Sequence, residues 1–550
     1  MISEAPISHH LPSWQKSVFL TLIVSMLLSS CSLDEHPKNQ IEEEIAYSSP
    51  DELYRNTIGT LYYYVGGNTD GQGLQGTCRG VYDLQTFGSD EALIPKRGTD
   101  WYDGGIWRQL YCHSWSGRHE IIGNAWMYLY KVIALCNRSL ETIEQNKDML
   151  YLPMYQRFTA EVRALRAIYY WYLLDLFGSV PIVTSTGVSI NDVEQASRSE
   201  LFEFVRTELE EAVHYLPNRN SVNKGEHYGR VTLSVAFFAL AKLYLNAEIY
   251  ADDNWTDAQH INGRDMKFNF LGRDLNAWEI CAYCCDVIGQ MGYHLSTNYD
   301  DNFNVNNENS VENIWTIPMD KNFFSNQQQN LFRSYHYRHA AAYGFGGENG
   351  TCASLKALEV NHYGKEDQDQ RFKMNYWYDI ATGLNEEPIT DRMGNPLIYQ
   401  PLEVSLDLSN NPYMETAGAR MKKYEVDRFA TNDGKLMDND IVLFRYADVL
   451  LMLAEAKVRN GEDGQAPFNL VRERAKMPLL PATLNNICNE RMIELAWEGW
   501  RRNDMIRFGI YKSTYDGPDS VDESDHHTIV FPIPNDVISL NTNLRQNPGY

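Results

Sequence analysis

The chain has 550 residues, of which 43% are hydrophobic and 22% charged, and this is the composition of a globular protein. Its formal net charge of −25 argues against nucleic acid as a ligand, because phosphate binding requires clustered lysine and arginine. The charge also disfavours broad attraction to an anionic membrane, but a local basic pocket can still bind an acidic polysaccharide. The 35 tyrosines and 12 tryptophans suit either thick cores or sugar-stacking surfaces, and composition does not separate these two uses.

The N-terminal region carries the signals of a secreted, lipid-anchored protein. Residues 18–28 (VFLTLIVSMLL) form an apolar run too short to span a bilayer but of the length of a signal-peptide core. The following Leu28-Ser29-Ser30-Cys31 resembles a lipobox, which predicts a signal peptide over 1–30 and a cleaved, diacylated Cys31. Residues 31–50 are polar and are expected to form a tether. An ordinary secretory signal with an unrelated cysteine remains the alternative.

Helical spacing dominates residues 51–294. The clearest case is the stretch 155–184, where Phe158, Val162, Leu165, Tyr169, Tyr172 and Leu176 recur at intervals of three and four. Gly178 and Pro181 predict a sharp end to this helix, and its wide apolar surface predicts two packing neighbours. Further helices are expected over 51–64, 124–145, 199–216 (capped by Ser199), 229–250 and 275–289. Zinc at the cysteines of WEICAYCCDVIG lacks a second ligand pair, so buried free thiols are favoured there.

The segment 88–117 is rich in aromatic residues that follow no helical or strand period. Glycines interrupt it, and flat rings beside carboxylates and amides on a loop are what carbohydrate recognition requires. The alternative, rings that fix a long loop to the protein body, carries equal weight for any single residue. The candidate ligand residues here are Asp90, Trp101, Tyr102, Trp107 and Trp115.

Residues 295–440 lose the long helical periods and hold asparagine, glycine and aromatic residues. A short strand is expected at Asn313–Ile317, and Phe324, Tyr335 and Tyr337 are candidate ligand residues. Asp367 and Asp369 suggest structural calcium, but two carboxylates fall short of its six to eight oxygen ligands. Helical spacing returns in three later segments, 445–460, 464–476 and 485–507.

Five ordered blocks resemble the SusD/RagB family, the surface glycan-binding lipoproteins of Bacteroidota. They are YQRFTAEVRALRAIYYWYLLDLFGSVPIVT, GRVTLSVAFFALAKLYLNAEIY, LFRYADVLLMLAEAKVRNG, NERMIELAWEGWRRNDMIRFG and the closing FPIPNDVISLNTNLRQNPGY. The resemblance implies a mainly α fold, a tetratricopeptide-like scaffold of helical pairs with an irregular, loop-rich subdomain that carries the ligand site. It places glycan contacts near 88–117, which favours Trp101, Tyr102 and Trp107, and a second aromatic group within 295–440. It also leaves open a structural role for Asp90 and favours one for Arg371.

The predicted domains are 1–30, 31–50, 51–294, 295–440 and 441–550. By resemblance, the protein is a non-catalytic, surface-exposed lipoprotein of the outer membrane, without a required cofactor or metal. It would capture an oligosaccharide or polysaccharide and deliver it to a SusC-like TonB-dependent transporter. Three alternatives remain. They are a peptide-binding lid protein, a glycoside-cleaving enzyme with two carboxylates about 5–10 Å apart, and a helical scaffold for protein partners.

Overall fold

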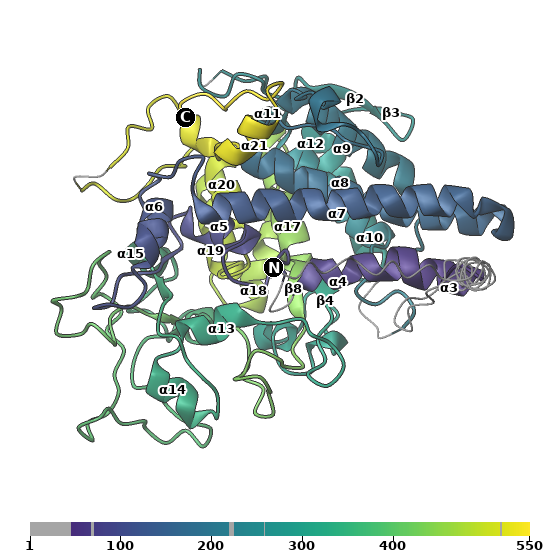
Figure 1. Cartoon of the computed structure of the whole chain (residues 1–550). Helices are drawn as coiled ribbons and strands as arrows, with labels where there is room; N and C mark the ends of the chain where they lie inside the picture. Colours follow the sequence, from purple (N-terminus) through teal and green to yellow (C-terminus); the bar gives the residue numbers. More distant parts are fainter. Residues whose placement is uncertain (1–45, 68–70, 219–224, 258, 518–519) are drawn as a thin grey trace, which may run out of the picture. The chain divides into compact units, whose positions relative to one another are not determined.

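Helices are the main regular secondary structure of the chain, as the spacing of its apolar residues predicts (Figure 1). The computed structural model describes residues 46–67, 71–218, 225–257, 259–517 and 520–550. Ser49–Tyr550 form one compact unit. The expected signal peptide and the lipidation site Cys31 lie outside the described residues. Within the described ranges, no helix combines the length and apolar character needed to cross a bilayer.

The first half contains the helices that the sequence predicts, with shifted ends. Ser197, rather than Ser199, caps the helix before Pro217, and Gly178 ends the long central helix with φ +70°. The elements are α3 (Pro50–Tyr54), a π-helical turn (Arg55–Gly59), α4 (Thr60–Gly66), α5 (Val81–Phe87), α6 (Ile106–Tyr111), α7 (Glu120–Gln145), α8 (Leu152–Phe177), α9 (Arg198–Ala212), α10 (Leu233–Leu245), α11 (Ala247–Tyr250) and α12 (Ala277–Gln290).

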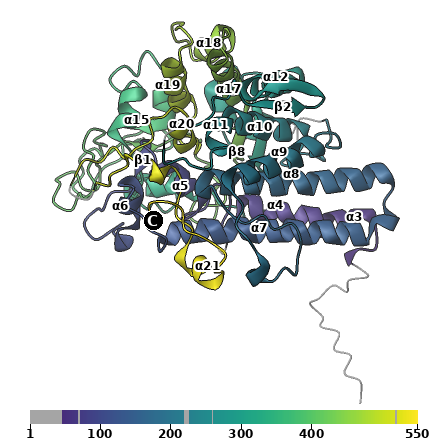
Figure 2. The same ribbon diagram turned by 90° about the horizontal axis from the view of Figure 1, so that it is seen from above.

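Helix α8 is the centre of the first half. Every residue from Ala164 to Phe177 is buried, because α8 packs against both α7 and α9. Two neighbours are what its wide apolar surface predicts. Figures 1 and 2 show α7 and α8 side by side as a long hairpin, with α3 and α4 alongside it. Cys281, Cys284 and Cys285 are buried free thiols on α12.

The region 295–440 is irregular, as expected, and its few strands are short. The predicted strand forms as β4 (Asn313–Ile317) and pairs antiparallel with β8 (Ile441–Arg445). The other elements here are α13 (Gln329–Ser334), α14 (Tyr337–Ala342), β5 (Cys352–Ala353), α15 (Leu355–Val360), α16 (Arg371–Asn375), β6 (Tyr376–Trp377) and β7 (Arg420–Met421). Elsewhere β1 (Ala92–Leu93) pairs with β5, and β2 (Lys267–Phe270) pairs with β3 (Arg273–Asn276).

The C-terminal region returns to helices, but one prediction is wrong. A single helix over 485–507 is replaced by two, because Trp497 and Gly499 adopt left-handed φ values of 65° and 74° between them. The helices are α17 (Tyr446–Arg459), α18 (Gln465–Arg474), α19 (Leu484–Glu494), α20 (Arg501–Arg507) and α21 (Asn535–Leu540). The mainly helical scaffold predicted from the sequence is confirmed.

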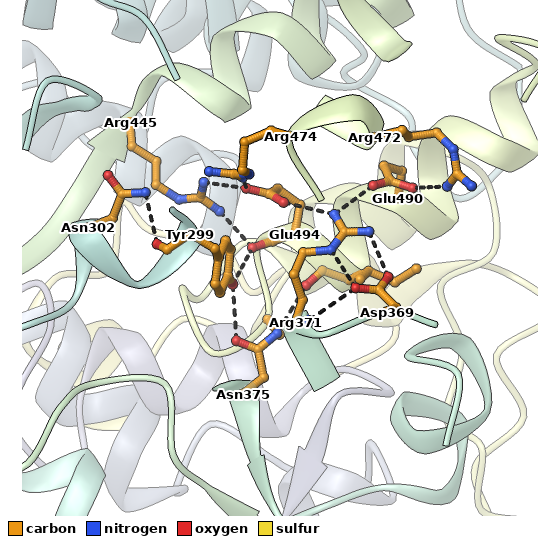
Figure 3. A network of polar contacts seen from close by, with 12 residues as sticks. Tyr299, Asn302, Asp369, Arg371, Asn375, Arg445, Arg472, Arg474, Glu490 and Glu494 are labelled. Carbon is orange, nitrogen blue, oxygen red and sulfur yellow. Dashed lines mark hydrogen bonds and ion pairs between the residues drawn. The ribbon is translucent and has the colours of Figure 1, made fainter. Parts of the chain in front are cut away.

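A buried ionic network ties the irregular region to these C-terminal helices (Figure 3). Arg371 on α16 contacts Glu490 at 2.6 Å and Glu494 at 2.8 Å, and both carboxylates lie on α19. Arg445 at the end of β8 reaches Glu494 at 2.6 Å. A buried charge is stable only when it is paired and hydrogen-bonded, so this network fixes α16 relative to α19. Arg371 therefore has the structural position that the sequence favoured.

The carboxylates considered for calcium are engaged by cations of the chain. Asp369 pairs with Arg371 at 2.8 Å, and Asp367 pairs with Lys373 at 2.6 Å. Across the part of the chain that the structure describes, no three His, Cys, Asp or Glu side chains are grouped to hold a metal ion.

Candidate ligand-binding site

The aromatic loop, residues 88–117, is anchored to the irregular region. The pairing of β1 with β5 holds its beginning, and Lys96 forms an ion pair with Asp407 at 3.2 Å. Arg97 and Asp100 exchange two backbone hydrogen bonds of 3.0 Å, which close a tight turn. After this turn come Trp101, which is half-buried, and Tyr102, which is exposed.

Trp101 is held in a fixed orientation at the surface. Its indole Nε1 donates to the carbonyl oxygen of Glu348 at 2.9 Å, and its ring lies directly against the backbone at Gly350. A Cβ at Gly350 would come within 2.5 Å of the ring. The backbone φ of Trp101, +61°, is uncommon for a bulky residue and persists only where surrounding contacts impose it. Trp101 is therefore a rigid, half-buried ring with little freedom to lose on binding.

Two tyrosines lie beside it. Tyr102 is 60% exposed, and Tyr337 at the start of α14 is 38% exposed. The Tyr337 hydroxyl donates to Asp100 Oδ2 at 2.7 Å, which joins α14 to the turn that precedes Trp101. Burial and the Asp100 carboxylate raise the pKa of Tyr337 to about 12, so its hydroxyl stays protonated at neutral pH. We call Trp101, Tyr102 and Tyr337 the aromatic face.

Two of the candidate ligand residues in loop 88–117 are buried and support that loop. Trp107 is 2% exposed, packs edge-on against Phe87, and donates from Nε1 to Asp103 at 2.8 Å. Trp115 is 5% exposed and donates to the Tyr550 hydroxyl at 2.7 Å. A ring without an open face cannot stack on a sugar, so the expectation that both contact ligand is corrected.

Asp90 and Tyr335 need the same correction. Asp90 is 5% exposed, and its two oxygens accept from Arg501 at 2.6 and 2.8 Å. Tyr335 is fully buried and accepts a hydrogen bond from Trp377 at 2.8 Å. Asp90 joins the loop to α20, and Tyr335 belongs to the packing beneath α14.

Phe324 remains a candidate, at a different place. It is 48% exposed, in a segment that Lys321 ties to Asp427 at 3.0 Å and to Asp438. Its segment is therefore joined to the 427–438 loop rather than to residues 100–102. A contribution of Phe324 to ligand binding stays a prediction.

A pocket that the sequence did not indicate adjoins the aromatic face. Its volume is about 460 Å³, and its walls come from the beginning of α14 and from residues 391–416. Arg97 donates to the carbonyl of the lining residue Met414 at 2.7 Å, so this wall touches the turn that precedes Trp101. The titratable residues of its lining are His336, Arg338, Asp391, Arg392, Tyr413 and Glu415. They come from separated segments without a shared motif, so no local signal reveals them.

Fold and site together define a mainly helical protein that presents aromatic rings at its surface. A family model described as "SusD family" matches residues 283–550, and one described as "Starch-binding associating with outer membrane" matches residues 90–245. The chain belongs to the SusD/RagB family.

Several relatives are similar over nearly the whole chain. The starch-binding protein SusD of Bacteroides thetaiotaomicron is 26% identical over 525 residues, which cover 88% of this chain and 87% of the relative. A SusD-like protein of Bacteroides ovatus is 26% identical over 522 residues, which cover 90% and 83%. SusD-like protein P25 of Formosa agariphila is 25% identical over 519 residues, which cover 90% and 89%.

Solved structures share the fold. A laminarin-binding SusD-like protein superposes with a TM-score of 0.67 at 20% identity, covering 91% of this chain and 100% of that one. Surface glycan-binding protein A from Bacteroides thetaiotaomicron, in complex with laminarihexaose, gives a TM-score of 0.66 at 19% identity, covering 90% and 99%. At this level of identity the likeness establishes the common fold.

Proposed function

We propose that the protein is a cell-surface glycan-binding lipoprotein that captures an oligosaccharide or polysaccharide without cleaving it. The observation that carries the proposal is the aromatic face, in which hydrogen bonds hold the rings of Trp101 and Tyr337 at the surface beside the exposed Tyr102. Relatives named for starch and laminarin binding support the same ligand class. Because fold alone does not determine function, the proposal depends on this surface.

The binding mechanism we infer is stacking at equilibrium. The exposed ring of Tyr102 and the fixed ring of Trp101 offer flat apolar surfaces to the C–H faces of sugar rings. Asp100 offers carboxylate oxygens to sugar hydroxyls nearby. Fixed rings reduce the ordering cost of binding, which favours affinity. We expect dissociation constants between micromolar and millimolar, about −8 to −4 kcal/mol, since tighter binding would slow release of the glycan.

Delivery and anchoring complete the proposal. A SusC-like TonB-dependent transporter would receive the glycan, and acyl chains at Cys31 would hold the protein on the outer membrane. The match to a family described as associating with the outer membrane supports this location. Two or more acyl chains give stable anchoring where one gives only marginal binding.

The test is affinity electrophoresis of the chain that begins at residue 32. The protein would migrate through gels that contain neutral or acidic polysaccharides, beside Tyr102→Ala and Trp101→Ala variants. Tyr151→Ala is the matched control, because Tyr151 is 63% exposed and precedes α8 on the distant hairpin. We expect one polysaccharide to retard the parent and the control but neither site variant.

Three other results would change the assignment. Retardation that persists in both site variants would move the site toward Phe324. Absence of retardation in every gel would contradict polysaccharide binding and favour a peptide ligand. Release of reducing ends from a polysaccharide by the purified protein would show that it is an enzyme.

A further inference from the structure

Two buried arginines behind the pocket lack carboxylate partners. Arg97 is 4% exposed and Arg420 is fully buried. Among the residues that the structure describes, neither guanidinium has a carboxylate oxygen within 4.0 Å. Among the described residues, most other deeply buried arginines are ion-paired, as Arg333 is with Asp83 at 2.8 Å, and Arg198 shares the lack of a carboxylate partner. A buried cation without an anion is costly, so its retention here calls for a physical reason.

Backbone carbonyls hold both arginines against the pocket wall. Arg97 donates to the carbonyls of Met414 at 2.7 Å and Ala417 at 3.0 Å. Arg420 donates to the carbonyl of Glu415 at 3.0 Å. Carbonyl dipoles stabilise the guanidinium groups but leave their full positive charges in place. Burial lowers the pKa of Arg97 to about 9, so it remains charged at neutral pH.

The pocket in front of this wall has an excess of positive charge. The exposed cations Arg338 and Arg392 in its lining are balanced by Asp391 and Glu415. Burial lowers the pKa of His336, which also lines the pocket, and this favours its neutral form. The two arginines behind the wall therefore leave an excess of two positive charges, in a protein whose formal net charge is −25.

Both lining carboxylates are already engaged within the protein. Asp391 Oδ1 accepts from the backbone N–H groups of Met393 at 2.8 Å and Asn395 at 2.9 Å. Glu415 lies 3.2 Å from His336 Nε2. The lining carboxylates are thus held by donors of the protein itself. Arg338 and Arg392 are exposed residues, and Arg338 Nη1 donates to the carbonyl of Thr390 at 3.2 Å.

The pocket is continuous with the aromatic face. Its lining residues His336 and Arg338 flank Tyr337 in sequence, and Met414 Sδ would lie 3.1 Å from a Cβ at Gly98. A glycan stacked on Tyr337 and Trp101 would therefore place an adjoining sugar at the pocket mouth. We propose that the pocket binds an anionic substituent of that sugar, a carboxylate or a sulfate, so that the ligand of this protein is an acidic glycan.

This inference rests on the proposed function and narrows it to a ligand class. Ion pairs with a desolvated anion are stronger than the neutral contacts that hydroxyl groups offer. A low-dielectric wall that carries two fixed charges adds a long-range attraction that salt weakens. The aromatic face supplies stacking to any glycan, whereas the pocket supplies the discrimination.

The experiment compares acidic polysaccharides with the same polymers after removal of their charges. Uronic-acid polymers are tested before and after carboxyl reduction, and sulfated polymers before and after desulfation, in affinity gels. The protein variants are Arg338→Gln, Arg392→Gln and the double variant, with the exposed Arg273→Gln on β3 as matched control. Each site variant should weaken binding about tenfold, equivalent to about 1.4 kcal/mol, and the control should bind as the parent does.

The expected result is retention by an acidic polymer that removal of its acid groups reduces at least tenfold. Loss on carboxyl reduction identifies a uronic acid, and loss on desulfation identifies a sulfate ester. Equal retention by the neutralised polymer, or unchanged binding in the double arginine variant, would overturn the acidic-glycan inference and leave the proposed function intact. Absence of retention by every polymer would overturn both.

Discussion

Replacing Asp90 by asparagine tests whether this residue supports the site or contacts ligand. The side chains of Asp90 and Arg501 are 5% and 4% exposed, and their two hydrogen bonds of 2.6 and 2.8 Å form a bidentate pair. Asparagine removes the charge and replaces one of the two accepting oxygens by an NH2 donor that faces the Arg501 guanidinium. Removing one partner of a buried ion pair leaves an uncompensated charge, which costs about 3–5 kcal/mol.

The assay is denaturant unfolding of the chain that begins at residue 32. Asp90→Asn should lower the free energy of unfolding by about 3–5 kcal/mol. As a control, Asp265→Asn at an exposed position should change it by less than about 0.5 kcal/mol. The double variant Asp90→Asn with Arg501→Met should recover part of the loss, because no charge then remains buried and unpaired. This double-mutant cycle isolates the coupling between the two side chains.

Glycan binding provides the decisive comparison. Below its unfolding transition, Asp90→Asn should be retarded in affinity gels as strongly as the parent, since Asp90 faces Arg501 and not the aromatic face. An Asp90→Asn variant that keeps its stability within about 1 kcal/mol and loses glycan retention would refute this reasoning. Asp90 would then have to be restored as a ligand contact.

Three further predictions follow from the buried groups. Arg371→Met leaves the carboxylates that it binds without their cation and should cost about 3–5 kcal/mol in denaturant unfolding; an unchanged transition midpoint would contradict the network. Burial lowers the pKa of His339 to about 3, below its unfolded value near 6.5. Acidification therefore protonates His339 in the unfolded chain before it does so in the folded one. The free energy of unfolding should fall by about 2 kcal/mol between pH 6.5 and 4.5. This pH slope should flatten in His339→Phe, and an identical slope in the variant would exclude His339 as its source. Gly350→Ala should displace the Trp101 ring and weaken glycan retention while the protein remains folded; full retention would show that the ring position is unimportant.

The scaffold was largely predictable from local patterns. A helix that packs on a core repeats its apolar residues every three to four positions, and the stretch around α8 does this up to Gly178. Family membership was also accessible, because it depends on ordered blocks of sequence. The break between α19 and α20 was not, since only the packed structure requires the left-handed φ values at Trp497 and Gly499.

The roles of the aromatic and charged residues depended on contacts between distant segments. Asp90 meets Arg501 across 411 positions, and Trp115 meets Tyr550 across 435. Composition cannot distinguish the buried Asp90 and Trp115 from the exposed Tyr102, because all three lie in the loop 88–117. The sequence by itself determined a helical scaffold and an aromatic loop. Tertiary packing decided which rings face solvent and which charges lack a partner, because burial depends on what the rest of the chain places against each side chain.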